Sequence, residues 1–242
     1  MARLVGPTWT AWYDVDDFFH ETGLLGRTAS SFSIVVTVDD KAVEDLNLRK
    51  IKTARIESGP KPAPRKDYVG VTAGTTRDAG LATLNGTQAQ FVNIEHVVLD
   101  GGSGGGVDSV TIVGTQGADS WTFAAASNAG ADNDGGRLTS SFAPPVTLQA
   151  FTDASTLRLE GRSGDDTFDL THAAAWAFAT VTVDGGSPTG SDAVRVVGDT
   201  VADDRFTYSA TAYNQGTLTV LSPQPGGTTT VYQLDDVESL AV

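Results

Sequence analysis

The sequence predicts an all-β fold for this chain of 242 residues, on the basis of its glycines, its short apolar segments and their spacing. The 27 glycines supply many places where the backbone can turn sharply, because glycine adopts positive φ angles without a steric penalty. Over short stretches apolar residues recur at every second position, as in strands with one buried face. Short strands between glycine- and aspartate-rich turns are typical of all-β proteins.

The first third of the chain is predicted to differ from the rest. Residues 1–58 form an N-terminal segment whose fold the sequence leaves unclear. Within it, residues 32–38 (FSIVVTV) predict a strand, and residues 43–56 fit a strand or a short helix. Residues 59–79 are predicted to be a linker, because they open with the stiff, basic stretch GPKPAPRK, which suits neither a helix nor a central strand.

Internal repetition begins after this linker and predicts a repeat region over residues 80–242. Residues 97–114 (VVLDGGSGGGVDSVTIVG) align without gaps to residues 181–198 (VTVDGGSPTGSDAVRVVG). Both segments continue into a related ending, in which Asp119 is matched by Asp203 and an aromatic strand follows.

The repeat region divides into units 80–135 and 136–215 and a truncated unit 216–242, so we expect the native polypeptide to continue. Each unit opens on a strand that begins with glycine: GLATL, GRLTS and GTLTV, starting at Gly80, Gly136 and Gly216. The second unit carries an extra turn, GDDTFDLTHAAAW, and an extra strand, ATVTV.

The repetition favours units that stack, since one unit of this size cannot bury its apolar face alone. A parallel β-helix, or β-solenoid, built of irregular Asp/Gly-rich repeats is therefore the predicted architecture. Tandem small β-sandwiches are the alternative.

Charge and cysteine content narrow the range of partners. Residues 79–242 carry 19 acidic and 5 basic side chains and so hold the whole net charge of −14. This negative field argues against binding to nucleic acid or to anionic membranes. The absence of cysteine excludes disulfides and thiolate metal sites. No apolar stretch is long enough for a transmembrane helix, and no signal peptide opens the chain.

One stretch resembles a known calcium-binding repeat. Residues 161–169 (GRSGDDTFD) resemble the hemolysin-type (RTX) nonapeptide GGxGxDxUx, with Arg162 in place of the second glycine. The turns before Asp108 and Asp192 resemble it with two inserted residues. This resemblance to repeat regions of large secreted bacterial surface proteins covers residues 80–242.

The resemblance implies a parallel β-roll that binds Ca²⁺ in its turns. Asp166 is then the first candidate ligand, with Asp165, Asp108 and Asp192 as the others. Oxygen-rich turns of carboxylates and exposed carbonyls suit a hard cation. The alternative is that the same aspartates and glycines only form turns between strands.

These observations predict a non-enzymatic, structural or adhesin-type repeat segment of an extracellular or cell-surface bacterial protein. Its expected partners are calcium ions, surface glycans or other domains of the same polypeptide. One alternative is a carbohydrate-binding or glycan-cleaving β-helix, in which Asp165, Asp166 and Asp169 would converge with Arg158 beside Trp176. The other is a protein-binding module in which residues 1–58 dock a partner.

Overall fold

The computed structural model describes the backbone of four N-terminal strands and most of the chain from residue 68 onward. The described residues are 2–5, 10–13, 32–38, 51–58, 68–84, 87–92, 94–101, 107–125, 135–151, 155–172, 176, 178–186, 191–199, 203–222 and 229–242. They form twenty strands and no helix, which confirms the predicted all-β class.

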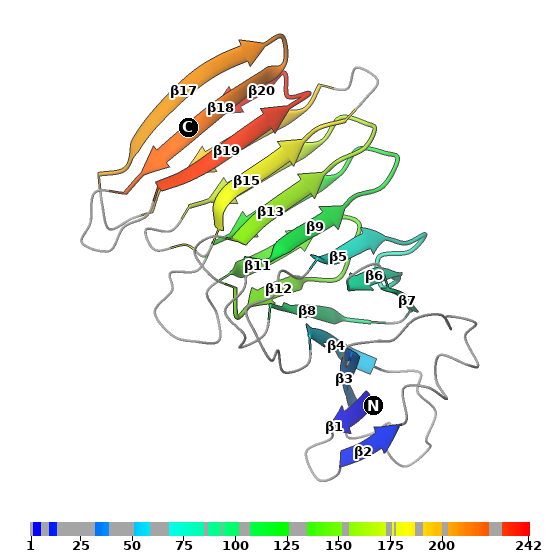
Figure 1. Ribbon diagram of the computed structural model, residues 1–242. Coiled ribbons are helices and arrows are strands. Elements are labelled where there is room, and N and C mark those ends of the chain that lie inside the picture. The colour runs from blue at the N-terminus through cyan, green and yellow to red at the C-terminus, as the bar shows by residue number, and fades with distance from the viewer. Residues whose placement is uncertain are drawn as a thin grey trace.

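The strands make two mixed sheets that lie face to face (Figure 1). In spatial order, sheet A contains β2 (Thr10–Tyr13), β1 (Ala2–Val5), β3 (Phe32–Val38), β4 (Ile51–Ser58), β8 (His96–Asp100), β12 (Val146–Gln149), β11 (Gly136–Ser140), β10 (Ser120–Ala124), β14 (Thr167–Thr171), β16 (Ala193–Val197) and β20 (Ser239–Ala241). Sheet B contains β17 (Arg205–Ala212), β18 (Gln215–Leu221), β19 (Thr229–Asp235), β15 (Phe178–Asp184), β13 (Ser155–Glu160), β9 (Ser109–Val113), β5 (Tyr68–Ala73), β6 (Gly80–Leu84) and β7 (Thr87–Phe91).

The chain crosses repeatedly from one sheet to the other. It runs from β8 in sheet A to β9 in sheet B, and single strands then alternate over β13, β14, β15 and β16. Successive strands within each sheet pair in parallel: β5, β9, β13, β15 and β19 in sheet B, and β10, β14, β16 and β20 in sheet A.

Three antiparallel meanders interrupt this alternation: β5–β6–β7, β10–β11–β12 and β17–β18–β19. The strands predicted to begin with Gly80, Gly136 and Gly216 are the middle strands of these meanders, with Gly216 the second residue of β18. The predicted repeat units therefore mark the points where the chain doubles back within one sheet.

The core lies between the two sheets and is built from every second residue of the strands. In β13, for example, Leu157 and Leu159 are buried, whereas the residues between them are only half-buried. The largest fully buried side chains include Trp121, which stacks on Phe168 of the neighbouring strand with ring centroids 5.2 Å apart. Alternation of this kind gives strands such as β10, β12, β13 and β14 one apolar face, and the two sheets cover each other's apolar faces.

The two aligned segments each contain two strands, but these strands occupy the two sheets in opposite order. Residues 97–114 run from β8 in sheet A to β9 in sheet B, whereas residues 181–198 run from β15 in sheet B to β16 in sheet A. In both, the two strands are separated by residues that begin with glycine, of which 102–106 and 187–190 lie outside the described residues. The supposed extra turn GDDTFDLTHAAAW is in part a strand, because it contains β14, which pairs on both edges.

The predicted boundary between linker and repeats lies too late in the chain. Within residues 59–79, Tyr68–Ala73 forms β5, whose Val69 and Val71 are buried in the core. Residues 43–56, which fit a strand or a helix, contribute most of β4, and β4 pairs in parallel with β8. The four strands of the N-terminal segment thus extend sheet A, while their side chains lie outside the described residues.

Candidate functional site

The feature with the most unusual chemistry is the set of corners where the chain passes from sheet B to sheet A. In three of these corners a glycine follows the strand of sheet B and an aspartate precedes the strand of sheet A. The pairs are Gly114 with Asp119, Gly161 with Asp166, and Gly185 with Asp192. The glycines stack, since Gly114 N donates to Glu160 O (2.8 Å) and Gly161 N donates to Asp184 O (2.8 Å).

The acidic residues of these corners form a column along the N-terminal ends of four neighbouring strands of sheet A. We call this set the acidic column: Asp119, Asp166, Asp192 and Glu238. The Asp119 backbone N–H donates to Asp166 Oδ1, that of Asp166 to Asp192 Oδ1, and that of Asp192 to Glu238 Oε2, each at 2.7 Å. Each acceptor is a carboxyl group, and where it is ionised the bond is stronger than one between neutral groups. The column ties each corner to the next through a side chain as well as through the backbone.

Glycine is required at these corners because the carboxyl group occupies the space of a Cβ atom. A Cβ on Gly161 would lie less than 3 Å from Asp166 Oδ2 and from the backbone O of Gly185. A Cβ on Gly185 would meet Asp192 Oδ2 and the backbone O of Asp236 in the same way. The glycine and the aspartate are therefore one structural unit, which explains why they recur together in the sequence.

The inner oxygens of two column members have no hydrogen-bond partner. Asp166 Oδ2 and Asp192 Oδ2 are buried and unpaired, in side chains that are 0% and 1% exposed. Burial raises the pKa of Asp166 to about 6, against the opposing effect of the N–H of Asp119. Burial also raises the pKa of Asp192. These two carboxyl groups consequently hold their protons more tightly than an exposed aspartate does.

Two other glycine–aspartate corners satisfy the second carboxyl oxygen locally. Asp119 Oδ2 accepts from Thr115 N (2.7 Å), and Asp204 Oδ2 accepts from Asp199 N (2.7 Å). Asp204, packed against Gly198, is thus the structural counterpart of Asp119. The sequence alignment paired Asp119 with Asp203 and was one residue short. The distance to the aromatic residue could have corrected it, because Trp121 and Phe206 each follow two residues after the corner aspartate.

The four predicted calcium ligands are not all brought together. Asp166 and Asp192 are neighbours in the acidic column, and Asp165 lies beside them, exposed, accepting from Ser191 N at 3.0 Å. Asp108 lies at a corner from sheet A to sheet B instead, where its N–H donates to Ser155 Oγ at 3.2 Å.

The donor set fits a calcium ion only in part. The unpaired Oδ2 atoms and the neighbouring carbonyl of Gly185 are donors of the kind that calcium prefers, but calcium takes six to eight oxygens. In the described part of the chain, no group of three or more His, Cys, Asp or Glu side chains could hold a metal ion. Calcium binding therefore stays a prediction.

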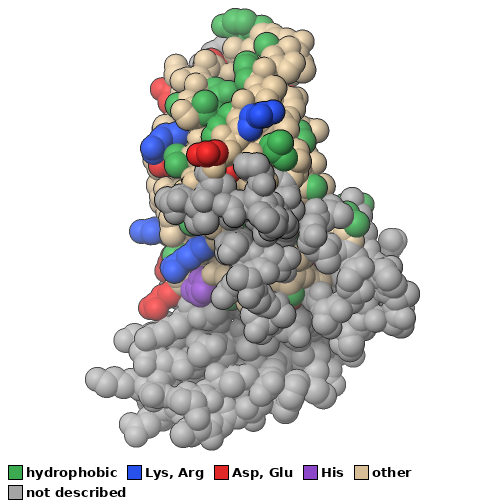
Figure 2. All heavy atoms as spheres, turned by 90° about the vertical axis from the view of Figure 1, so that its left-hand side faces the viewer, with side chains coloured by type: hydrophobic (Ala, Val, Ile, Leu, Met, Phe, Trp, Pro, Cys, Tyr) green, Lys and Arg blue, Asp and Glu red, His purple; other side chains and the backbone are tan. Residues whose placement is uncertain are grey.

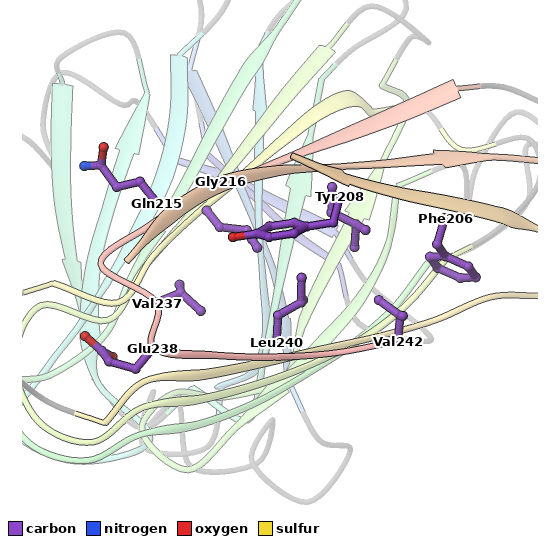
Figure 3. A pocket seen from close by; sticks show the side chains of 10 residues that line it. Phe206, Tyr208, Gln215, Gly216, Val237, Glu238, Leu240 and Val242 are labelled. Carbon is purple, nitrogen blue, oxygen red and sulfur yellow. The ribbon is translucent and has the colours of Figure 1, made fainter. Parts of the chain in front are cut away.

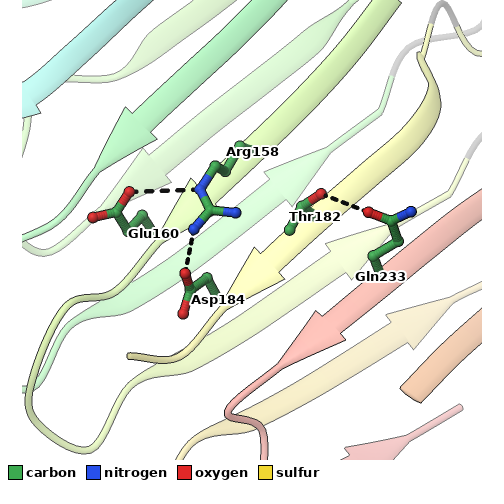
Figure 4. A network of polar contacts seen from close by, with 5 residues as sticks. All are labelled: Arg158, Glu160, Thr182, Asp184 and Gln233. Carbon is green, nitrogen blue, oxygen red and sulfur yellow. Dashed lines mark hydrogen bonds and ion pairs between the residues drawn. The ribbon is translucent and has the colours of Figure 1, made fainter. Parts of the chain in front are cut away.

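The carboxylates of the glycan-cleaving alternative do not converge. Asp169 lies on the outer face of sheet A, 3.4 Å from Arg195. Arg158 lies on the outer face of sheet B, where it pairs with Asp184 and Glu160 (Figure 4). Trp176 is buried in the core and donates from Nε1 to Gly135 O at 2.9 Å. The groups that this alternative needs in one groove are thus divided among two outer faces, a corner and the core.

Sequence reasoning missed Glu238 as the last member of the column. A glutamate replaces the aspartate there, and Asp236 stands where the other corners have glycine. Glu238 also accepts a hydrogen bond from Asn214 Nδ2 (2.5 Å), in the turn between β17 and β18. The signal was the position itself: an acidic residue one place before a short strand, as at Asp119, Asp166 and Asp192.

His172 and Tyr232 form a second buried polar contact, inside the core. His172 Nδ1 lies 3.4 Å from the Tyr232 hydroxyl, and Nε2 has no partner. Burial lowers the pKa of His172. These contacts and the lowered pKa describe His172 as a neutral imidazole that packs edge-on against Trp176 and Tyr232.

Among the described residues, the structure contains no helix of the length and apolar character needed to cross a membrane. A scan against protein-family models, a search of curated proteins and a search of solved structures each found no match to this chain.

Proposed function

We propose that this chain is a non-enzymatic structural segment of an extracellular bacterial surface protein, and that its strands form a two-sheet β-solenoid. The observation that carries the proposal is the parallel pairing of successive strands in both sheets, β9–β13–β15–β19 in one and β10–β14–β16–β20 in the other. A chain that alternates between two sheets in this way advances by one strand per crossing. Its length then grows with the number of crossings.

The corners suit such a segment to bearing load. The four crossings from β9 to β10, β13 to β14, β15 to β16 and β19 to β20 are each tied to the next by backbone hydrogen bonds and by a carboxyl group of the acidic column. The core is continuous from Val69 to Leu240, so neighbouring strands support each other along the whole stack. In the described residues the ionisable groups of the glycan-cleaving alternative stay apart, which favours a structural role over catalysis.

The mechanical role can be tested by pulling the chain from its two ends in a force spectrometer. We expect unfolding in several force peaks, since the stack has to open strand by strand. As a control, the variant Arg195→Ala removes an exposed ion pair on the outer face of sheet A. It should leave the force peaks unchanged, because exposed ion pairs contribute little to stability. Extension at low force without peaks would contradict a load-bearing segment.

Calcium belongs to this proposal as a stabilising ligand of the acidic column. Asp166 and Asp192, with the carbonyl oxygen of Gly185, would hold the ion, and its charge would offset repulsion in a region with 19 acidic and 5 basic side chains. The support is the pair of buried carboxyl oxygens without partners.

Calcium binding is tested by thermal unfolding at neutral pH in millimolar Ca²⁺ and in EDTA. We expect a higher midpoint with Ca²⁺, because a ligand that binds only the folded chain stabilises it. The gain should be lost in Asp192→Asn and kept in Asp169→Asn, whose carboxyl group lies on the outer face. Equal midpoints in the two buffers would remove calcium from the proposal and leave the structural role in place.

A further inference from the structure

The crossing from β14 to β15 is built differently from the crossings that leave β8 and β16 for sheet B. Gly101 and Gly198 directly follow β8 and β16, and a Cβ on either would lie less than 3 Å from Oδ2 of the aspartate before the next strand, Asp108 or Asp204. His172 directly follows β14, and the sequence has no acidic residue between it and β15. A titratable ring therefore replaces the glycine–aspartate unit at this crossing.

The imidazole of His172 lies in the core, although the backbone of the residue keeps its place in the stack. The backbone N–H donates to Val197 O at 2.7 Å, and the residue is 1% exposed. The ring meets Trp176 and Tyr232 edge-on, with centroids 6.2 and 6.4 Å away. Trp176 in turn contacts Phe178 of β15, and Tyr232 belongs to β19. The ring is thus packed where β14, β15 and β19 meet.

This surrounding suits a neutral imidazole and not a charged one. Nδ1 lies 3.4 Å from the Tyr232 hydroxyl, a long contact, and Nε2 is buried without a partner. A neutral ring that carries its proton on Nδ1 leaves Nε2 as an acceptor, whereas an imidazolium is a donor at both nitrogens. Protonation would therefore place both a charge and an N–H without an acceptor in the core, which is costly.

The charged groups that act on the ring do not compensate for its burial. Asp204 and Asp199, from the corner between β16 and β17, favour the imidazolium, but burial outweighs them and lowers the pKa of His172. Asp204 is already engaged, since Oδ1 accepts from Ser222 Oγ and Oδ2 accepts from Asp199 N. Tyr232, from β19, stays neutral at acidic and neutral pH because burial raises its pKa.

The ring gains no access to water through the apolar groove of about 380 Å³ between β17, β18 and β20. Figure 3 shows Tyr208 and Phe206 on one wall of this groove and Leu240 on the other, and His172 does not line it. Charged side chains elsewhere lie on the outside of the stack, where water solvates them (Figure 2). A charge on His172 would have to be borne by the core.

We propose that His172 makes the stack acid-sensitive: when the pH falls, the imidazole takes up a proton that the core cannot accommodate, and the packing of β14 against β15 and β19 opens. Histidine is suited to this role because its charge changes under mildly acidic conditions. The proposal depends neither on calcium nor on the mechanical function. It rests on the buried ring, on its unpartnered nitrogen and on the loss of the glycine–aspartate unit at this one crossing.

The direction of the effect follows from the proton balance. Because the pKa of His172 is lowered from 6.5 in the folded chain, the folded state binds fewer protons than the unfolded state as the pH falls through this range. The unfolding free energy contributed by His172 is therefore fully present at neutral pH and falls with the pH. The buried carboxyl groups of the acidic column act with the opposite sign, since their pKa values are raised.

The test compares chemical unfolding of the parent with that of His172→Asn and His172→Phe in EDTA. Neither replacement titrates; asparagine keeps a polar group near the position of Nδ1, and phenylalanine keeps an aromatic ring. The carboxyl groups of the column are present in all three proteins. We expect the unfolding equilibrium constant of the parent to rise by about tenfold or more, relative to each variant, between about pH 7 and about pH 5.

Tyr232→Phe is the control. It removes the one polar contact of the ring and keeps the titratable group. Its stability differs from that of the parent by the lost contact, but its dependence on pH should match that of the parent.

Hydrogen exchange locates the opening. At about pH 5, the backbone amides of β14 and β15 should exchange at least about tenfold faster in the parent than in His172→Phe, whereas those of β5 and β6 should exchange alike in both. Equal acceleration in all four strands would contradict opening at this crossing.

Two further results would overturn the proposal. One is the same dependence of stability on pH in the parent and in both His172 variants. The other is an NMR titration of the folded parent, which needs no variant, that shows the imidazole of His172 already charged at about pH 6.

Discussion

Asp166→Asn is expected to raise the stability of the protein near neutral pH and to have little effect below about pH 4. The substitution keeps an oxygen that can accept from the Asp119 N–H. It replaces the unpaired Oδ2 with an amide group that can donate toward the nearby carbonyl of Gly185. It also removes a charge from a side chain that is 0% exposed.

The pH dependence follows from the direction of the pKa shift. Burial raises the pKa of Asp166 from 3.8 to about 6 in the folded chain, so between these values the folded state binds more protons than the unfolded state. The unfolding free energy contributed by this group therefore rises as the pH falls from about 6 to about 4. A shift of about two units corresponds to roughly 3 kcal/mol. Above the folded pKa the parent carries this cost in full, and the asparagine variant does not.

The comparison between parent and variant isolates this one group. Burial also raises the pKa of Asp192 and lowers that of His172. Both groups are present in parent and variant, so their own contributions largely cancel in the difference, apart from the effect of the Asp192 charge on the pKa of Asp166. The measurement is chemical unfolding of both proteins in EDTA across the acidic and neutral range.

Asp165→Asn provides the matched control. It removes the same charge one residue earlier, from an exposed side chain that also accepts a backbone N–H, that of Ser191. Its effect should stay within about 0.5 kcal/mol across the same range. If Asp166→Asn destabilised the protein at neutral pH in EDTA, the negative charge of Asp166 would be stabilising the fold, and burial would not be what governs this carboxyl group.

The sequence predicted the recurring parts of the fold better than their placement. Asp192 and Gly185 could be foreseen as a turn because residues 97–114 and 181–198 repeat the same strand–turn–strand pattern. That these segments lie in opposite sheets could not be foreseen, because both kinds of corner use the same glycine–aspartate unit. An odd number of crossings separates the two segments, and a periodic sequence pattern does not report which sheet a strand joins.

Long-range pairing accounts for the remaining differences. Asp108 resembles Asp166 in its local sequence. Asp108, however, lies at a corner from sheet A to sheet B and Asp166 at a corner from sheet B to sheet A, so no shared site could form. Tyr68–Ala73 follows a proline-rich stretch, and its role as β5 depends on pairing with β9, some 40 positions later in the chain. The buried state of Trp176 likewise depends on a contact with Gly135.

Gly185→Ala is expected to destabilise the protein by about 2–3 kcal/mol, because the added methyl group has no space. Its Cβ would lie less than 3 Å from Asp192 Oδ2 and from the backbone O of Asp236. The second contact is decisive. A side chain can rotate away, but a carbonyl oxygen can move only if the corner between β19 and β20 moves with it, and Gly185 N already donates to Asp235 O at 3.0 Å in that corner.

Gly117→Ala is the control that separates the steric clash of an added methyl group from the general effect of replacing a glycine. Gly117 lies in a corner of the same kind, but a Cβ there would have Thr115 Oγ1 as its nearest neighbour, at 3.9 Å. The backbone entropy of the unfolded chain falls in both variants, which alone would stabilise them by about 0.4–1 kcal/mol. Chemical unfolding should therefore find Gly117→Ala unchanged or slightly more stable and Gly185→Ala clearly less stable. Equal stability of the two variants would mean that the corner yields easily, and the stacking of glycine against carboxyl group would then not be what holds successive crossings in register.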